Sequence, residues 1–196
     1  MHMLRFINWV KFIYYYPAWL AYKRLGTFGC SELQVWIDVL KINCGGLRKN
    51  FIWIFRNKPE YRSLLYLRVK EAKLLRLLYP GQQNLYFEVE SNKIGNGLVF
   101  QHGYSTIVNV ENMGRDCQIW QNVTLGKDKP GGGKPVIGNN VKIFAGAVVV
   151  GDIIVGDNVI IGANAVVTKT VPDNCTVVGI PARIVKRDGI RVDELL

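Results

Sequence analysis

The chain lacks the residue patterns that mark several common protein classes. Its 196 residues include two histidines and four cysteines, and no two cysteines form a CxxC pair. This excludes zinc fingers and disulfide-rich secreted domains, so we expect reduced, mostly buried thiols in a cytoplasmic protein. No apolar run reaches the roughly 18 uncharged residues of a membrane-spanning helix, because Lys11 and Lys23 interrupt the first one. A signal-peptide layout is also lacking.

Acidic residues are scarce in the first 80 residues. That segment has 14 Lys and Arg against 4 Asp and Glu, whereas residues 81–196 have 11 of each. The first segment also has 16 of the 22 aromatic residues. Basic residues interleaved with bulky apolar ones, without a nucleic-acid motif, predict no nucleic-acid partner. Two roles stay open for this surface: contact with the inner face of an anionic membrane, or helical contacts that join copies of the chain.

Residues 1–80 have the pattern of an α-helical region. Pro59 suits a first helical turn, and apolar residues then recur at helical spacing until Pro80-Gly81 ends the run. Ser31 is a candidate N-cap for a helix that runs through Leu40. Residues 4–22 form an aromatic, apolar segment with basic residues between them.

Residues 81–187 contain an internal repeat of six residues. The aliphatic positions that share one phase are Ile137, Ile143, Val149, Val155, Ile161 and Val167, and the phase extends back through Leu125, Ile119, Met113 and Ile107. A second aliphatic or alanine series lies four residues after each position, and Gly-Asn or Gly-Asp pairs recur between them. Short strands with an inward apolar residue, separated by turns, satisfy this period, whereas an α-helix would spread the apolar residues around its axis.

The period therefore predicts an all-β solenoid, a parallel β-helix of about five three-sided coils, preceded by the helical region. Residues 126–135 break the phase with glycine, proline and lysine, and are expected to form a projecting loop. Residues 188–196 are expected to be a short charged tail.

Three runs in this half are recognisable as a set: Lys93–Gly103 (KIGNGLVFQHG), Gln121–Gly126 (QNVTLG) and Val178–Val185 (VGIPARIV). Their order resembles the serine acetyltransferase branch of the hexapeptide-repeat acyltransferases. Residues 59–66 also resemble the helix that precedes the β-helix in relatives acting on polysaccharides. The resemblance implies a left-handed coil, a homotrimer or a dimer of trimers, and acetyl-CoA as co-substrate.

The resemblance also implies that His102 is the catalytic base. A hydroxyl is a weak nucleophile at neutral pH, so a base must take its proton as it attacks a thioester, and imidazole suits this task. His2 is the one other histidine. The family places an acidic partner of this histidine one coil earlier, where Glu88 matches best and Glu90 is an alternative. Such a carboxylate would orient the imidazole and stabilise its charged form.

In this family, coenzyme A lies between neighbouring subunits along small residues at coil corners. The positions that match this cofactor site are Gly126 with the adjoining Lys127, Ala145 and Ala163, and the basic candidates for its phosphates are Arg183, Lys186 and Arg187. No metal is expected, because a three-histidine zinc site of the carbonic anhydrase type cannot be built from one histidine in the repeats.

Two departures from the family bear on the acceptor. Serine acetyltransferases have an acidic residue just before the catalytic histidine and a second histidine before the proline that ends the loop. Gln101 and Lys134 stand at these places. A serine ammonium needs a partner for its charge, so these residues favour a sugar or polysaccharide hydroxyl as acceptor. Serine acetylation and a non-catalytic trimeric scaffold stay as alternatives.

Overall fold

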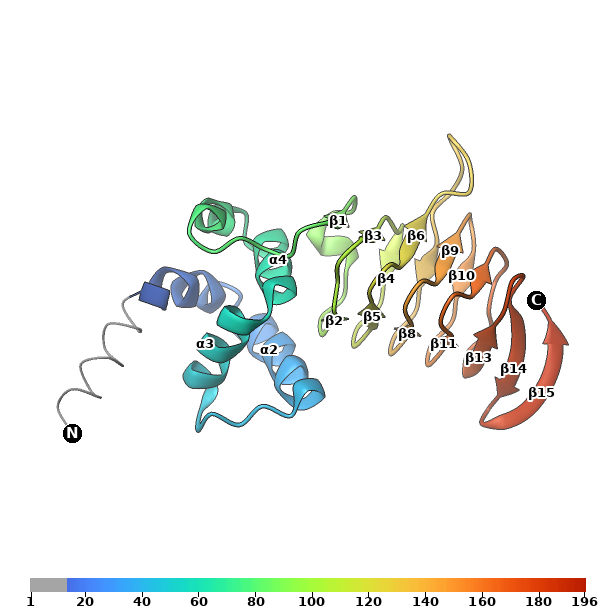
Figure 1. Ribbon diagram of the computed structural model, residues 1–196, viewed down its shortest axis with the longest axis horizontal. Coiled ribbons are helices and arrows are strands. Elements are labelled where there is room, and N and C mark those ends of the chain that lie inside the picture. The colour runs from blue at the N-terminus through green and yellow to red at the C-terminus, as the bar shows by residue number, and fades with distance from the viewer. Residues whose placement is uncertain (1–13) are drawn as a thin grey trace. The chain divides into compact units, whose positions relative to one another are not determined.

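The computed structural model describes residues 14–196, and the chain divides into two compact units, Met1–Gly81 and Gln82–Leu196 (Figure 1). We call them the helical unit and the coil unit. The first part of the aromatic segment predicted at residues 4–22 lies outside the described residues. Within residues 14–196, no helix combines the length and the hydropathy needed to cross a membrane.

The helical unit is held together by buried aromatic rings. Residues 14–23 are helical, and the elements that follow are α2 (Gly26–Leu40), α3 (Leu47–Asn57), α4 (Pro59–Arg68) and the 3-10 helix η1 (Lys70–Leu77). Phe51 on α3 lies 4.9 Å from Tyr22 and 6.2 Å from Tyr61 between ring centroids. Trp36 on α2 lies 5.3 Å from Tyr61. Burial of each large side chain contributes about 1.5–3 kcal/mol, so these rings fix the packing of α2, α3 and α4.

The helix predicted from Pro59 to the end of the leucine run is interrupted at Val69. The backbone there is extended, with φ −120° and ψ 99°, and the chain continues as η1. Leu74 and Leu78, which the helical spacing placed on the buried face, are therefore 79% and 62% exposed. The prediction of a single helix is wrong because Val69 ends α4 and changes the phase of all later residues.

The predicted N-cap at Ser31 is also wrong. Helix α2 begins five residues earlier, at Gly26, whose φ of 56° suits glycine. Ser31 lies inside the helix, and its hydroxyl donates to the carbonyl oxygens of Thr27 and Phe28 at 3.2 and 3.0 Å. A serine inside a helix can satisfy its hydroxyl in this way without capping anything.

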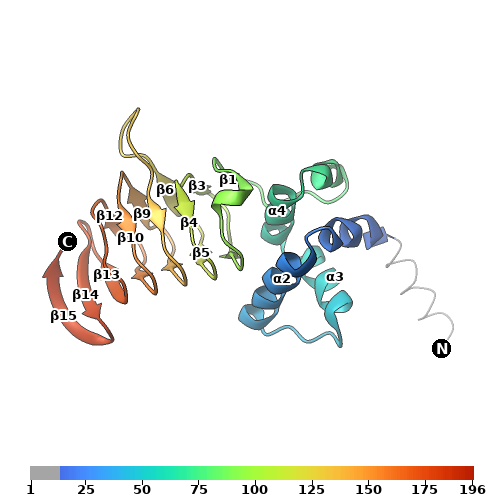
Figure 2. The ribbon, with the colours of Figure 1, turned by 180° about the vertical axis from the view of Figure 1, so that it is seen from behind.

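The coil unit consists of three sheets that the chain visits in turn (Figures 1 and 2). Sheet A contains β1 (Leu85–Phe87), β3 (Thr106–Val108), β6 (Thr124–Gly126), β9 (Val148–Val150) and β12 (Val166–Val167). Sheet B contains β4 (Asn112–Met113), β7 (Val136–Ile137) and β10 (Ile154–Val155). Sheet C contains β2 (Val99–Gln101), β5 (Gln118–Trp120), β8 (Lys142–Ile143), β11 (Ile160–Ile161), β13 (Cys175–Val178), β14 (Arg183–Arg187) and β15 (Ile190–Leu195). A short 3-10 helix, η2 (Ser91–Lys93), follows β1.

Parallel pairing stacks equivalent residues of successive coils. Ile137 pairs with Val155 in sheet B, Ile143 with Ile161 in sheet C, and Val149 with Val167 in sheet A. All six of these side chains are at most 2% exposed. The residues of the second predicted series, from Val141 to Val171, are likewise buried. The period-six prediction of the core is thus confirmed over these coils.

Ile107 departs from the predicted phase. It is half-buried, whereas its neighbour Val108 is fully buried and pairs with Leu125. Val108 precedes the buried Met113 by five residues, while the steps from Met113 to Leu125 and from Ile137 to Val167 take six each. The corner between β3 and β4 is therefore one residue shorter, which shifts the inward position from Ile107 to Val108.

The expected C-terminal tail is a β-strand. Strand β15 pairs antiparallel with β14 and extends sheet C, with Arg187 opposite Ile190. Asp188 and Gly189 form the two-residue turn, with φ values of 51° and 80°. Positive φ at both central residues is what a type I′ hairpin turn requires, and Asp-Gly is a favoured sequence for it. Arg183 on β14 and Asp193 on β15 are 2.7 Å apart across the hairpin.

The four cysteines are free thiols. Cys117 and Cys175 are buried in the coil unit, but Cys30 is exposed and Cys44 is half-buried. The prediction of mostly buried cysteines therefore holds for the coil unit alone.

Candidate active site

His102 lies at the corner between sheet C and sheet A, directly after β2. Gln101 is paired with Trp120 and Ile107 with Thr124. Five residues lie between Gln101 and Ile107, whereas three residues lie between their partners Trp120 and Thr124 in the next coil. The two additional residues make this corner protrude, and the His102 side chain is exposed.

The backbone of His102 has a left-handed conformation, with φ 61°. Ser105, Asn122, Gly146 and Asn164 lie in register at this corner and have φ values between 52° and 74°, so each coil uses one left-handed residue to turn here. His102 is a second such residue at the corner of its own coil. A large side chain in this region costs free energy, on the order of 1 kcal/mol or more, and such residues concentrate at functional sites.

The corner continues in later coils with small side chains. The Gly146 N–H donates to the Gln121 carbonyl at 3.0 Å, and the Asn164 N–H donates to the Ala145 carbonyl at 2.9 Å. These bonds place Gln121, Ala145 and Ala163 in one row that continues the corner of His102. A wall of stacked rings lies beside the row, where Trp120 and Phe144 are 4.3 Å apart. Small residues allow an extended ligand to approach the backbone here.

Gln121 was missed as a candidate by sequence reasoning. Its Oε1 atom is buried and has no hydrogen-bond partner among the described residues. A buried carbonyl oxygen without a donor is costly, so it can accept a hydrogen bond from a bound molecule at this corner. The one sequence signal for a role of Gln121 is its place at the start of the QNVTLG motif.

Glu88 and Gly126 lie at the other end of the sheet A strands. The Glu88 carboxylate accepts a hydrogen bond from Asn109 Nδ2 at 2.8 Å, and the backbone N–H of Glu88 donates to the Val108 carbonyl at 3.0 Å. Gly126 ends β6, and a Cβ atom built there would meet only Asn109 Cβ within 4 Å, at 3.9 Å. Lys127, the next residue, is exposed. A Cβ atom could therefore be accommodated at Gly126, and this end of the sheet also carries a carboxylate and an amine.

A single chain does not bring His102 and Glu88 together. His102 precedes β3 and Glu88 lies level with Asn109, which follows β3. The four residue steps from Ser105 to Asn109 span about 13 Å of extended chain, and His102 precedes Ser105 on the corner at the near end of that span. Glu90, the alternative partner, is exposed and precedes η2 on the same side as Glu88.

The predicted site residues thus form two groups. His102, Ala145 and Ala163 lie at one end of the sheet A strands, and Glu88, Gly126 and Lys127 lie at the other. Gln101 belongs to the first group as the last residue of β2. Lys134 belongs to the second, because it precedes Pro135, whose carbonyl accepts from the Glu111 N–H.

The loop between β6 and β7 stands away from the coils (Figures 1 and 2). It follows Gly126 and ends at Lys134, as the break in the repeat predicts. Its tip at residues 127–131 is exposed. It therefore extends the surface beside Gly126.

The basic candidates lie on β14. Arg183 is held by Asp193, and Arg187 Nη2 donates to Glu194 Oε2 at 2.5 Å. The latter bond lowers the pKa of the Glu194 carboxyl and raises the pKa of Arg187. Lys186 is exposed. The hairpin strand thus engages both arginines with carboxylates, which leaves Lys186 as the better phosphate candidate.

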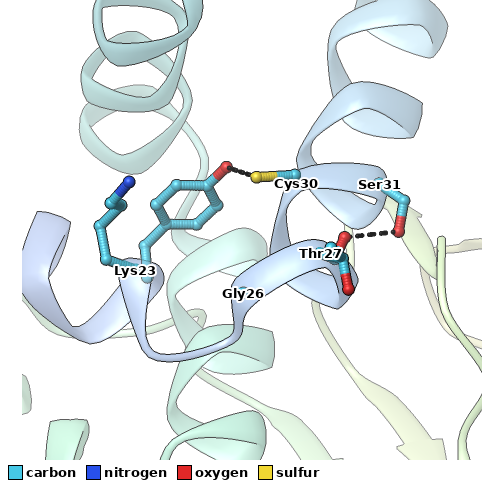
Figure 3. A pocket seen from close by; sticks show the side chains of 6 residues that line it. Lys23, Gly26, Thr27, Cys30 and Ser31 are labelled. Atoms are coloured by element: carbon cyan, nitrogen blue, oxygen red, sulfur yellow. Dashed lines mark hydrogen bonds between the residues drawn. The ribbon is translucent and has the colours of Figure 1, made fainter.

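A separate pocket of about 460 Å³ lies in the helical unit (Figure 3). Its lining includes Tyr22, Lys23, Gly26, Thr27 and Cys30. The Tyr22 hydroxyl donates to Cys30 Sγ at 3.3 Å, and burial, with a smaller effect of this bond, raises the pKa of Tyr22 well above its usual value. No predicted catalytic or cofactor residue lines it. Among residues 14–196, no three His, Cys, Asp or Glu side chains are grouped as metal ligands.

Part of the repeat region matches a known protein family. Residues 134–169 match the model of the bacterial transferase hexapeptide family, which describes six repeats. This match lies within the coil unit.

Curated relatives match about half of the chain. A serine acetyltransferase of Synechococcus elongatus is 45% identical over 106 residues, which are 53% of this chain and 43% of that protein. A serine acetyltransferase of Staphylococcus aureus is 48% identical over 103 residues, 51% of this chain and 48% of that protein. The chain therefore spans about half the length of the curated relatives that it matches.

Solved structures resemble more of the chain. The crystal structure of Neisseria gonorrhoeae serine acetyltransferase covers 87% of this chain and 69% of its own, with a TM-score of 0.62 and 23% identity, which shows a shared fold. A serine acetyltransferase in complex with CoA covers 84% of this chain and 72% of its own, with a TM-score of 0.58 and 26% identity. The fold of most of this chain is thus shared with these structures.

Proposed function

We propose that this chain is an acetyl-CoA-dependent O-acetyltransferase in which His102 is the general base. The observation that carries the proposal is the position of His102: an exposed, left-handed residue on an enlarged corner, at the head of a row of small residues. The relatives named serine acetyltransferase and the solved complex with CoA support the same activity. The left hand of the coils belongs to the same proposal and is supported by the hexapeptide match.

The proposed reaction uses one proton-accepting side chain. The imidazole of His102 takes the proton of the acceptor hydroxyl as its oxygen attacks the thioester carbonyl of acetyl-CoA. The C–S bond then breaks, and the imidazolium returns the proton to the departing thiolate. The products are an acetyl ester and free coenzyme A. Ala145 and Ala163 would accommodate the pantetheine arm along the same corner, and Lys186 would meet a phosphate.

We further propose that the site is completed by trimerisation. One chain places His102 and Glu88 at opposite ends of sheet A, so a carboxylate from a neighbouring copy would have to orient the imidazole. Gly126 and Lys127 of that copy would then face the same cleft. We expect the active species to be a homotrimer or a dimer of trimers. Multi-angle light scattering of the active protein tests this, and an active monomer would contradict it.

For the acceptor, the names of the relatives favour L-serine over the glycan that residue patterns alone indicated. We therefore propose L-serine as the first acceptor. A sugar or polysaccharide hydroxyl remains the second candidate, and Gln101 and Lys134 are the observations that favour it. Neither residue carries a negative charge to pair with the serine ammonium group.

Purified protein is expected to release coenzyme A from acetyl-CoA when L-serine is added and to form O-acetylserine, as mass spectrometry would show. The variant Gln101→Asp serves as the matched comparison, because a carboxylate at that place would pair with the ammonium group and lower the KM for serine. If the wild-type protein instead ignores millimolar serine and acetylates sugar hydroxyls, the serine assignment is wrong and the glycan assignment replaces it.

A further inference from the structure

The 3-10 helix η1 presents three different edges. A 3-10 helix has three residues per turn, so residues three apart lie on one edge. Ala72, which is 3% exposed, and the half-buried Leu75 form the edge that packs on the helical unit. Glu71, Leu74 and Leu77 form a second edge, on which the two leucines are 79% and 87% exposed. Leu78 follows directly and is 62% exposed.

The third edge of η1 is basic. It consists of Lys70, Lys73 and Arg76, all of them exposed. The Arg76 guanidinium lies 5.5 Å from the ring centroid of Tyr66. Glu71, at the start of the second edge, is the one acidic residue of the helix, and it lies 3.9 Å from the guanidinium of Arg24. An edge with two exposed leucines at its end and a cationic edge are therefore adjacent on one short element.

The described surface of the helical unit has an excess of basic residues. Residues 14–81 contain twelve Lys and Arg but four acidic residues. Glu32 and Glu60 are 2% and 6% exposed and the Arg68 side chain is 2% exposed, so these three contribute little to the outer surface. Asp38 accepts a hydrogen bond from Gln34 at 2.8 Å. A partner that covers Leu74 and Leu77 must therefore also accept a strongly positive neighbourhood.

We propose that η1 docks the protein on an anionic lipid bilayer, with Leu74, Leu77 and Leu78 inserted among the acyl chains and the basic edge on the headgroups. Three exposed leucines need an apolar phase, and three cations beside them need negative charge, and an anionic bilayer supplies both at one surface. A second copy of the helical unit would bring two cationic surfaces together, which the charge opposes. This inference does not depend on the acetyltransferase assignment.

The test is co-sedimentation of the full-length protein with phosphatidylcholine vesicles, with and without phosphatidylglycerol. We expect binding to the anionic vesicles at low salt and little binding to neutral ones. The variant Lys70→Gln/Lys73→Gln/Arg76→Gln should lower the partition coefficient by about tenfold or more, since each basic residue near an anionic surface contributes about a factor of five. Leu74→Ser/Leu77→Ser should also lower it severalfold, because it removes the inserted surface.

The matched control removes the same charge elsewhere on the helical unit. Lys41, Lys49 and Arg56 are all exposed and lie outside η1, so Lys41→Gln/Lys49→Gln/Arg56→Gln should bind more tightly than the η1 charge variant. Equal losses in the two charge variants would overturn the assignment to η1. Absence of binding to anionic vesicles would overturn the proposal, and so would a leucine variant that keeps full binding. If the wild-type protein does not bind vesicles and Leu74→Ser/Leu77→Ser forms a smaller assembly than the wild-type protein, the partner of this surface is a second copy of the chain.

Discussion

Replacement of His102 by asparagine is expected to lower acetyl transfer by about 100-fold or more while the coil unit keeps its thermal stability. The loss follows from the proposed role of the imidazole, because an amide cannot accept a proton from the acceptor hydroxyl at neutral pH. Initial rates of coenzyme A release with saturating acetyl-CoA would measure the change.

Asparagine is the suitable replacement because of the backbone at this corner. The φ of His102 is 61°, and asparagine adopts this conformation more readily than most residues do. The coils use it in the same way at Asn122 and Asn164, with φ 57° at both. His102→Asn therefore tests the imidazole without disturbing the turn, whereas His102→Ala would add backbone strain.

A neighbouring substitution supplies the control. Tyr104 lies on the same enlarged corner and is 45% exposed, so Tyr104→Phe should retain most of the activity. Circular dichroism melting and light scattering establish that both variants stay folded and assembled. Turnover near the wild-type rate in folded His102→Asn would remove His102 from the mechanism.

The period of the repeat predicted the coil core well for a physical reason. Each coil of parallel strands places the next inward residue after a constant number of positions, so Ile137, Val149 and Val167 report local geometry directly. The prediction failed where a corner changed length, as before Met113. When a corner gains or loses one or two residues, the aliphatic pattern of the sequence changes only by a shift in phase. Only the pairing of strands shows which corner changed.

Two misses in secondary structure differ in kind. The hairpin of β14 and β15 could have been predicted, because Asp188-Gly189 is a recognised turn pair between two runs with aliphatic residues. The break at Val69 could not, since no glycine or proline marks it. Helix α4 ends there although the leucines that follow have a high helical propensity.

Candidate site residues can be named from the motif, but their arrangement cannot. The motif around His102 identifies the histidine, and the same motif suggests a carboxylate one coil earlier. It cannot show that Glu88 and His102 lie at opposite ends of sheet A, because the enlarged corner at residues 102–105 becomes visible only in the register. Because of this separation, the proposed pairing of His102 with a carboxylate requires a second copy of the chain.

The helical unit contains a buried ion pair whose loss should have a large effect on stability. Glu32 on α2 and Arg68 on α4 are 3.0 Å apart, and their side chains are 3% and 2% exposed. The Arg68 guanidinium also lies 4.9 Å from the ring centroid of Phe28. Glu32→Gln leaves a buried cation without its counter-charge, which typically costs about 3–5 kcal/mol. Urea unfolding followed by helical circular dichroism would measure this loss.

Two comparisons distinguish this effect from a general sensitivity of the helical unit. Glu71→Gln makes the same chemical change in the exposed pair with Arg24, whose side chains are 65% and 72% exposed, and should cost less than about 1 kcal/mol. The double variant Glu32→Met/Arg68→Met replaces both charges by apolar groups of similar length and should recover most of the lost stability. Recovery would show that the single variant is penalised by the charge left behind. A double variant as unstable as Glu32→Gln would mean instead that the pair contributes strong net attraction between α2 and α4.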